Sequence, residues 1–182
     1  HFEARRQRQM CIRDRTDTEA GGYDQTRIEN RKDVLVYSSS MLQKGVEVTG
    51  LLKANLFVTS SAKDTDFTVK LVDVYPDGRA FNVQEGVVRM RYRESLQNSS
   101  LINPGEIYEI QVDLNATSNY FAKGHTIRVE ISSSNFPRIE RNLNTGEKNY
   151  LGTHYVNATN KVLLGGVHAS YIELPVIPRI SE

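Results

Sequence analysis

Several features that define whole classes of protein are missing from this sequence. It contains one cysteine, Cys11, and no tryptophan. A single cysteine can form neither an internal disulfide nor a cysteine-based metal cluster. No apolar run is long enough to span a bilayer, and no apolar stretch of a signal peptide is visible after His1. We therefore expect no membrane partner and favour a cytoplasmic over a secreted location, while the oligomeric state stays open, a homo-oligomer included.

An excess of charge of one sign is also missing, since 23 basic residues stand against 22 acidic ones. Five arginines lie within residues 1–15, so the rest of the chain carries a slight excess of acids. A nucleic-acid-binding domain usually concentrates positive charge on one face. The body of the chain is therefore expected to have no nucleic-acid partner.

The residues of a hydrolytic active site are not visible either. The chain has no Gly-x-Ser-x-Gly motif, which places the nucleophile of α/β-hydrolases on a sharp turn. Its histidines have no neighbours at metal-ligand spacing. We expect His125 and His168 to be surface or supporting residues, whereas His154 lies in a long loop and is harder to dismiss. The sequence thus predicts no catalytic residue, no cofactor and no metal site in this chain.

Three regions differ in composition. Residues 1–16 are rich in Arg and Gln and show no alternation; a basic arm is one interpretation, but we favour a disordered or non-native extension. Residues 17–32 are polar, contain two adjacent glycines and are typical of a linker or arm. Residues 33–182 are predicted to form one domain.

That domain is predicted to be all-β. Apolar and polar residues alternate along most of its segments, which is typical of strands with one buried face. Gly50 interrupts the longest alternating run, 46–59, and predicts a bulge or bend there. Turn-forming pairs such as Asp77-Gly78 separate the segments, and no helical period is sustained. We predict an antiparallel jelly-roll β-sandwich.

Three aspartates lie in or just before a predicted strand. Asp64 and Asp66 precede a strand, and we interpret them as loop caps that accept hydrogen bonds from backbone amides rather than as calcium ligands. Asp73 lies inside an apolar strand, where an unpaired carboxylate is costly. We expect a partner for it, for example an arginine of the run 89–93, whose arginines alternate with apolar residues and predict one cationic face.

The segment SSSNFPR (132–138) closes a strand and opens a long polar stretch, 138–160. One interpretation makes Phe136 an anchor of the loop in the core. The other makes the segment a rigid rim, in which Pro137 restricts Phe136 and Arg138 faces a carboxylate. Long loops on a rigid scaffold often carry function or contact another domain.

Several segments in register resemble a known family. They are DVLVY (33–37), VEVTG (46–50), DTDF (64–67), KLVDVYPDGRA (70–80), PGE (104–106), KGHTIRV (123–129), SSSNFPR (132–138) and NLNTG (142–146). Together they closely resemble the C-terminal domain of the X-Pro dipeptidyl-peptidase and cocaine esterase hydrolase family, from about Asp33 to Pro178.

The resemblance implies a serine hydrolase of esters or amides, with an α/β-hydrolase domain, a helical cap and a C-terminal jelly roll of galactose-binding-like shape. The catalytic triad would lie in the missing upstream part, so this piece alone is expected to be inactive. The jelly roll would pack on the hydrolase domain and help wall its substrate pocket. Candidates for that contact are Asp64, Asp66, Phe67, Asn135, Phe136, Pro137 and Arg138. The alternative is a free-standing carbohydrate- or ligand-binding module, although sugar platforms favour exposed aromatics and the chain has no Trp.

Overall fold

The computed structural model describes residue 22 and residues 24–178. One short helix, α2 (Thr26–Glu29), precedes the strands of this part of the chain. The strands are β1 (Leu35–Ser38), β2 (Val46–Ser60), β3 (Asp66–Val74), β4 (Ala80–Arg89), β5 (Tyr108–Phe121), β6 (Thr126–Ser132), β7 (Asn160–Gly165), β8 (His168–Ala169), β9 (Tyr171–Glu173) and β10 (Val176–Ile177). Two 3-10 turns, η1 (Met90–Tyr92) and η2 (Asn149–Leu151), lie in the connections.

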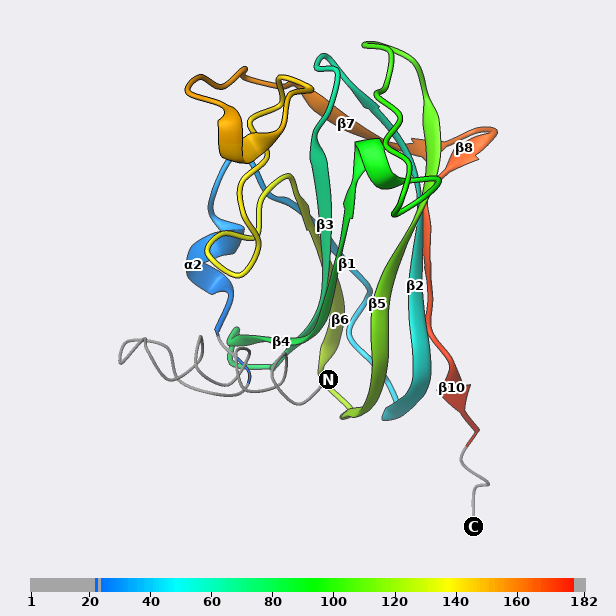
Figure 1. Cartoon of the computed structure of the whole chain (residues 1–182). Helices are drawn as coiled ribbons and strands as arrows, with labels where there is room; N and C mark the ends of the chain where they lie inside the picture. The colour runs from blue at the N-terminus through cyan, green and yellow to red at the C-terminus, as the bar shows by residue number, and fades with distance from the viewer. Residues whose placement is uncertain (1–21, 23, 179–182) are drawn as a thin grey trace, which may run out of the picture.

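The strands form two antiparallel sheets that face each other (Figure 1). The first sheet has the order β1-β6-β3-β4. In the second, β2 pairs with β5 along one edge and with β10, β9 and β7 in succession along the other. The chain changes sheet repeatedly from β1 to β7, as in a jelly roll. The predicted all-β antiparallel sandwich is confirmed, while the likeness to galactose-binding domains stays a prediction.

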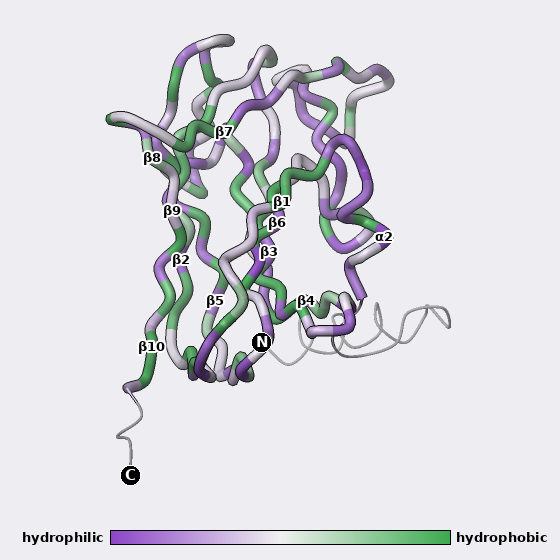
Figure 2. The backbone as a smooth tube through the Cα atoms, turned by 180° about the vertical axis from the view of Figure 1, so that it is seen from behind, coloured by the Kyte–Doolittle hydropathy of each residue, from purple (hydrophilic) through white to green (hydrophobic). Residues whose placement is uncertain are grey.

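The core lies between the sheets because alternate residues of each strand point inward. Hydrophobic and hydrophilic segments alternate along β2 in Figure 2, and its apolar side chains meet those of β3 and β5. The fully buried members of this core include Val48, Leu52, Val58, Phe67, Val69, Leu71, Val112, Leu114 and Phe121. Each such side chain stabilises the fold by roughly 1.5–3 kcal/mol.

The bulge in β2 lies close to where the sequence predicts it. The register of β2 against β5 shifts between Leu51 and Lys53. Gly50 has a φ of 139°, and a Cβ there would lie 2.9 Å from a ring carbon of Pro175. Only glycine tolerates both the backbone angle and the close approach.

Strand β3 is buried on both faces along most of its length. Its outer face is covered by an arm, residues 24–34, and by the 138–160 loop; Figure 1 shows both beside the first sheet. The arm is bound closely, since Gln25 is buried and its backbone amide donates to the carbonyl of Ala80 at 2.7 Å. The extension at 1–16 lies outside the described residues. Within the described part, no helix has the length and apolar character to cross a membrane.

Candidate functional site: a pinned loop and the cleft beside it

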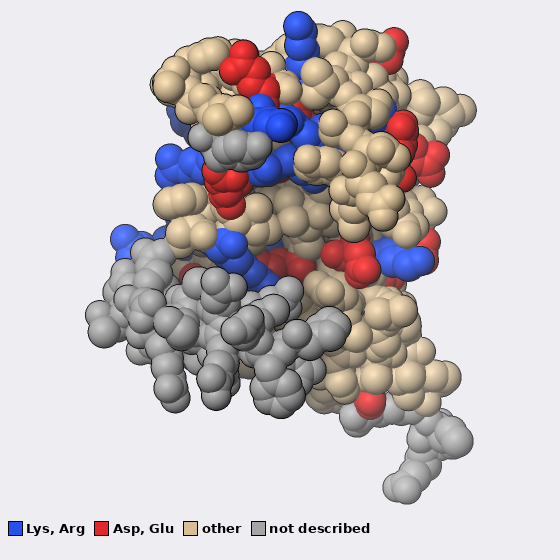
Figure 3. Space-filling model, viewed as in Figure 1, with Lys and Arg blue, Asp and Glu red and all other residues tan. Residues whose placement is uncertain are grey.

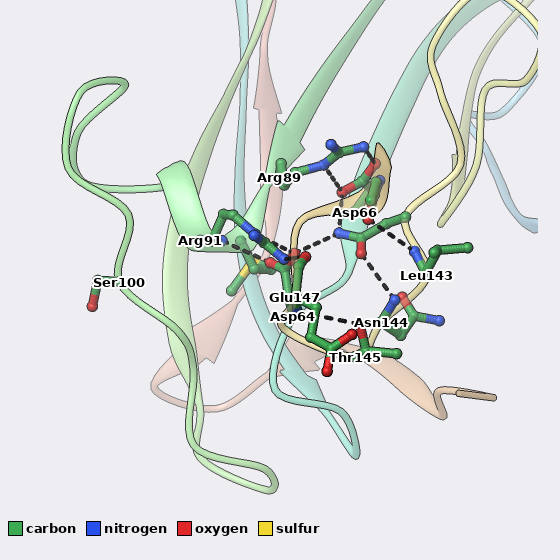
Figure 4. Close-up of polar contacts among 12 residues, drawn as sticks. Asp64, Asp66, Arg89, Arg91, Ser100, Leu143, Asn144, Thr145 and Glu147 are labelled. Atoms are coloured by element: carbon green, nitrogen blue, oxygen red, sulfur yellow. Dashed lines mark hydrogen bonds and ion pairs between the residues drawn. The ribbon is translucent and has the colours of Figure 1, made fainter. Parts of the chain in front are cut away.

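Two buried carboxylates, one at the start of β3 and one just before it, bind two arginines, one at the end of β4 and one in the turn η1 that follows. Asp66 accepts two hydrogen bonds from Arg89, Nε to Oδ1 at 2.9 Å and Nη2 to Oδ2 at 3.0 Å. Asp64 accepts from the backbone amide of Arg91 at 2.9 Å and from its Nε at 2.7 Å. Both carboxylates are almost completely buried. Figure 4 shows the four side chains pointing toward one another.

The network also holds the 138–160 loop. The amide of Asn142 donates to Oδ2 of Asp64 and to Oδ1 of Asp66, each at 2.8 Å. Arg89 donates to the carbonyl of Glu140 at 3.0 Å, and Arg91 to that of Glu147 at 2.7 Å. The loop has little regular structure, so these charge-assisted bonds fix its position on the sandwich.

The sequence interpretation of these residues is correct only in part. Asp64 does accept a backbone hydrogen bond, as a loop cap would, but its partner amide is that of Arg91 in the turn η1 after β4. The expected cationic face of the run 89–93 is wrong, because Arg89 and Arg91 fold back onto the two carboxylates. The chain leaves the strand at Met90 and turns through η1, which breaks the alternation.

The partner of Asp73 is His125 and not an arginine of 89–93. The Nδ1 of His125 lies 2.8 Å from Oδ1 of Asp73, and the imidazole packs on the ring of Tyr75 at 4.3 Å between centroids. The physical reason is register: β3 pairs with β4 so that Asp66 faces Arg89, while Asp73 faces Phe81 at the far end. The hydrogen bonds found within the described ranges bring no hydroxyl to this imidazole.

The segment 132–138 forms an exposed rim. Phe136 is 58% exposed, so its predicted role as a core anchor is wrong. The guanidinium of Arg141 lies over its ring, 4.4 Å from the centroid, and the peptide bond to Pro137 is cis. Arg138 forms an ion pair with Glu85 of β4, which also accepts from Asn135 at 2.9 Å. Arg138 thus finds its facing carboxylate within the chain.

The predicted contact residues therefore fall into two groups. Asp64, Asp66 and Phe67 are buried inside the domain, the first two in the network and Phe67 in the core. Residues 135–138 lie at the surface. Their assignment to a contact with another domain stays a prediction.

A cleft of about 450 Å³ opens beside this rim, on the outer face of the first sheet. One wall is the arm, the other is the loop, and Lys70 and Glu130 line the sheet between them. In Figure 3 the surface is hollowed next to the loop, and charged side chains gather around the hollow. Its lining residues are Ile28, Arg31, Asp33, Val34, Lys70, Glu130, Ser132, Ser133, Ser134, Asn135, Phe136, Arg141, Asn142 and Asn144.

Sequence reasoning missed the two charged residues that line the sheet side of this cleft. Lys70 and Glu130 are direct neighbours across β3 and β6. Burial raises the pKa of the Glu130 carboxyl to about 7, although the Lys70 ammonium opposes this. Burial also lowers the pKa of Lys70. Both residues occupy polar positions of alternating strands, so the pattern alone predicts solvent exposure. Within the described residues, no group of three or more His, Cys, Asp or Glu side chains could hold a metal ion.

The loop end of the sandwich exposes apolar side chains. Leu96 in the β4–β5 connection is 88% exposed, and Tyr155 in the 138–160 loop is 71% exposed. Leu101, Leu151 and Val156 of the same two loops are also exposed. Several apolar residues exposed at one end of a domain are typical of a surface that contacts another protein or domain.

Comparison with known proteins places the whole arrangement in context. A family profile described as the X-Pro dipeptidyl-peptidase C-terminal non-catalytic domain matches residues 4–173. Cocaine esterase from Rhodococcus sp. (strain MB1 Bresler) is 54% identical over 162 residues, which are 87% of this chain and 28% of that protein. The family match begins at residue 4, inside the segment 1–16, whose non-native origin stays a prediction.

Solved structures give the same result. An α-amino acid ester hydrolase superposes with a TM-score of 0.83 and 30% identity, covering 86% of this chain and 27% of that one. An aminopeptidase from the marine sediment archaeon Thaumarchaeota archaeon gives a TM-score of 0.82 and 31% identity, over 86% of this chain and 28% of that one. The chain therefore spans little more than a quarter of the length of these relatives.

Proposed function

This chain belongs to the family of X-Pro dipeptidyl-peptidase C-terminal non-catalytic domains, and we propose that it packs on the α/β-hydrolase and cap domains of a serine hydrolase. One observation carries the proposal: 87% of the chain aligns with cocaine esterase at 54% identity but covers only 28% of it. The sequence also lacks the Gly-x-Ser-x-Gly motif of an α/β-hydrolase nucleophile. The reaction would thus occur in the remaining three quarters, and this domain would support it.

The loop end is the surface we assign to the contact. Domain interfaces combine an apolar centre with a polar rim. Leu96 and Tyr155 would supply apolar area, and Phe136 and Arg138 would lie at the rim beside the cleft. The Asp–Arg network supports this assignment, because a loop held by buried charged hydrogen bonds loses little conformational freedom on docking.

The substrate class follows from the relatives. Cocaine esterase and α-amino acid ester hydrolase are named for ester substrates, and aminopeptidase for a peptide bond. We propose that the parent protein acts on an acyl ester, amide or peptide. This domain would contribute side chains that wall the acyl pocket, with Phe136 as the foremost candidate.

The test uses hydrogen–deuterium exchange on the full-length protein and on this chain alone. Docking predicts that amides of the β4–β5 connection and of the 138–160 loop exchange more slowly in the full-length protein. Amides on the outer face of β2 and β5 should exchange equally in both. Equal exchange everywhere, or a reading frame without an α/β-hydrolase region, would contradict the proposal.

A matched pair of variants sharpens this test. Leu96→Asp places a charge in the proposed contact, whereas Leu51→Asp places one at a 67% exposed position on the outer face of β2. Both leucines are exposed, so each change should alter the stability of the isolated chain by no more than about 0.5 kcal/mol. In the full-length protein only Leu96→Asp should lower hydrolytic turnover and restore fast exchange in the loops.

A free-standing ligand-binding module remains the second candidate, because the polar cleft beside exposed Phe136 has the dimensions of a small-molecule site. Calorimetry of the chain with mono- and oligosaccharides tests it. Saturable binding that Phe136→Ala abolishes would favour the module over the docking domain.

A further inference from the structure

The arm is attached to the first sheet mainly by polar contacts. Lys70 on β3 donates to the side-chain oxygen of Gln25 at 2.9 Å. Arg128 on β6 donates to Oε2 of Glu29 at 2.7 Å. Ile28, the apolar residue between them, remains 37% exposed and so buries only part of its surface. The strength of the attachment therefore depends on how well these polar groups are satisfied.

Two carboxylate oxygens at this attachment have no hydrogen-bond donor within the described part of the chain. Oε1 of Glu29 and Oε1 of Glu130 are both buried, and neither has a donor among the described residues. Glu29 lies on the arm and Glu130 on the sheet, and Arg128, which binds Glu29, lies two residues before Glu130 on the same face of β6. An ionised carboxylate only accepts hydrogen bonds, so these two oxygens can satisfy each other only if one carboxyl carries a proton and donates it to the other.

The charged groups around Glu29 and Glu130 do not supply the missing donor. Lys70 faces Glu130 across the strands, but its ammonium donates to Gln25. Arg128, two residues before Glu130 on β6, donates to the other oxygen of Glu29 and to Ser38 of β1. The position opposite Glu130 on β1 is Val36, which offers no charge.

The remaining charged groups near the pair have partners of their own. Glu85 on β4 is paired with Arg138 of the loop. Arg31 is paired with Asp33 on the arm. Arg141, which lines the cleft, stacks on the ring of Phe136.

We propose that Glu29 and Glu130 share one proton, and that this proton fastens the arm to the sheet and closes one wall of the cleft. When the proton leaves, two carboxylates face each other in a largely buried site and repel, so the arm separates from the sheet around α2. Because Ile28, Arg31, Asp33 and Val34 of the arm line the cleft, this separation widens it. The inference concerns the arm of this chain and does not depend on docking to a hydrolase domain.

The direction of the pH effect follows from linkage. Burial is the largest cause that raises the pKa of Glu130, from 4.5 to about 7, and the neighbouring Glu29 raises it further. Between these two pH values, the form with the arm bound to the sheet therefore binds more protons than the form with the arm detached. The attachment of the arm to the sheet is therefore strongest in acid. It weakens as the pH rises from about 4.5 to about 7 and changes little above that range.

Carbon-13 and nitrogen-15 NMR of the whole chain tests the proposal directly. We expect the side-chain carboxyl signal of Glu130 to titrate with a midpoint near pH 7. The backbone amides of residues 26–34 should lose order, measured by the heteronuclear Overhauser effect, over the same pH range. A Glu130 midpoint near 4.5, or arm amides that do not follow the titration, would overturn the proposal.

Three variants test whether the titration of Glu130 is set by a proton shared with Glu29 or by burial alone. Glu130→Gln keeps a permanent N–H donor toward Glu29, so the arm should stay ordered from pH 5 to pH 8.5. Glu29→Gln removes the second carboxylate and supplies a donor, so the Glu130 midpoint should fall by about one unit or more. Glu94→Gln, at a 66% exposed position, is the control and should leave both measurements unchanged. An unchanged Glu130 midpoint in Glu29→Gln would show that burial alone sets the titration and would also overturn the proposal.

Discussion

Asp66 and Arg89 face each other at the same register position of β3 and β4 and form a two-pronged ion pair. The side chain of Asp66 is 3% exposed, so removal of Arg89 leaves a buried charge without its main partner. We expect Arg89→Ala to reduce the free energy of unfolding by about 3–5 kcal/mol. Arg89→Lys should recover only part of this, because an ammonium cannot reproduce the two parallel bonds. Urea denaturation followed by circular dichroism measures both values.

An exposed ion pair provides the control for that prediction. Arg79 and Asp77 are about half exposed and also form an ion pair. Arg79→Ala should change the free energy of unfolding by no more than about 1 kcal/mol. Equal effects of the Arg79 and Arg89 changes would mean that the buried network does not stabilise the fold as argued.

Asn142 is the residue through which the network holds the 138–160 loop. Its amide contacts both Asp64 and Asp66, so Asn142→Ala should loosen the loop while the strands stay intact. Asn142→Asp should be worse, because it brings a third carboxylate against two buried ones. In hydrogen–deuterium exchange, the amides of residues 138–160 should exchange fastest in Asn142→Asp, more slowly in Asn142→Ala and most slowly in the wild type. Faster exchange of Asn142→Ala throughout β3 as well would contradict a role confined to the loop.

The sequence predicts the strands well and their partners poorly. Alternation identifies β2, β5 and β6, because a half-buried strand must alternate whatever its neighbours are. The partner of Asp73 depends on the register of β3 with β4 and β6, which the local pattern does not contain. The sequence analysis offers an arginine of 89–93 as the partner, and the fold instead brings His125 to Asp73.

The cleft illustrates the same limit. Phe136 and Arg138 were expected at a rim because Pro137 and a strand end are local signals. Glu130 and Lys70 gave no such signal, since polar residues on the outer face of a sheet are usually solvated. They become a site only because the arm folds back over them, and the contacts of Gln25 and Glu29 that hold it there join residues far apart in the sequence.

Gly86 on β4 lies directly against the backbone of β5 in the facing sheet. A Cβ at this position would clash with the backbone oxygen of Asp113 on β5 and lie 2.8 Å from its carbonyl carbon. Because backbone cannot yield as a flexible side chain can, Gly86→Ala should reduce the free energy of unfolding by about 1–3 kcal/mol or more. Gly165→Ala is the matched control, since no atom lies within 4 Å of its would-be Cβ. It should be neutral or stabilise by up to about 1 kcal/mol in the same denaturation assay.

The His125–Asp73 pair resembles two thirds of a catalytic triad, and we expect it to be a structural contact. It is largely buried and packs on Tyr75, at the end of β3 opposite the Asp–Arg network. His125→Gln, which keeps a donor, should cost less stability than His125→Ala, whose loss we expect at about 1–3 kcal/mol. In the full-length protein, turnover measured below the unfolding temperature should be the same for both variants and wild type. A large fall in turnover for His125→Gln would indicate that the imidazole takes part in chemistry.

The raised pKa of Glu130 also predicts how the stability of the chain depends on pH. The folded state holds a proton that the unfolded state releases near pH 4.5, so the free energy of unfolding should fall as the pH rises toward about 7. Glu130→Gln removes the titrating group and should remove this part of the slope. The stability of the variant relative to wild type should therefore increase with pH between 4.5 and 7 and be constant above it. Urea denaturation at half-unit pH steps measures the difference. A difference that does not vary with pH would mean that Glu130 titrates alike in the folded and unfolded chain, and the polar attachment of the arm would then need another explanation.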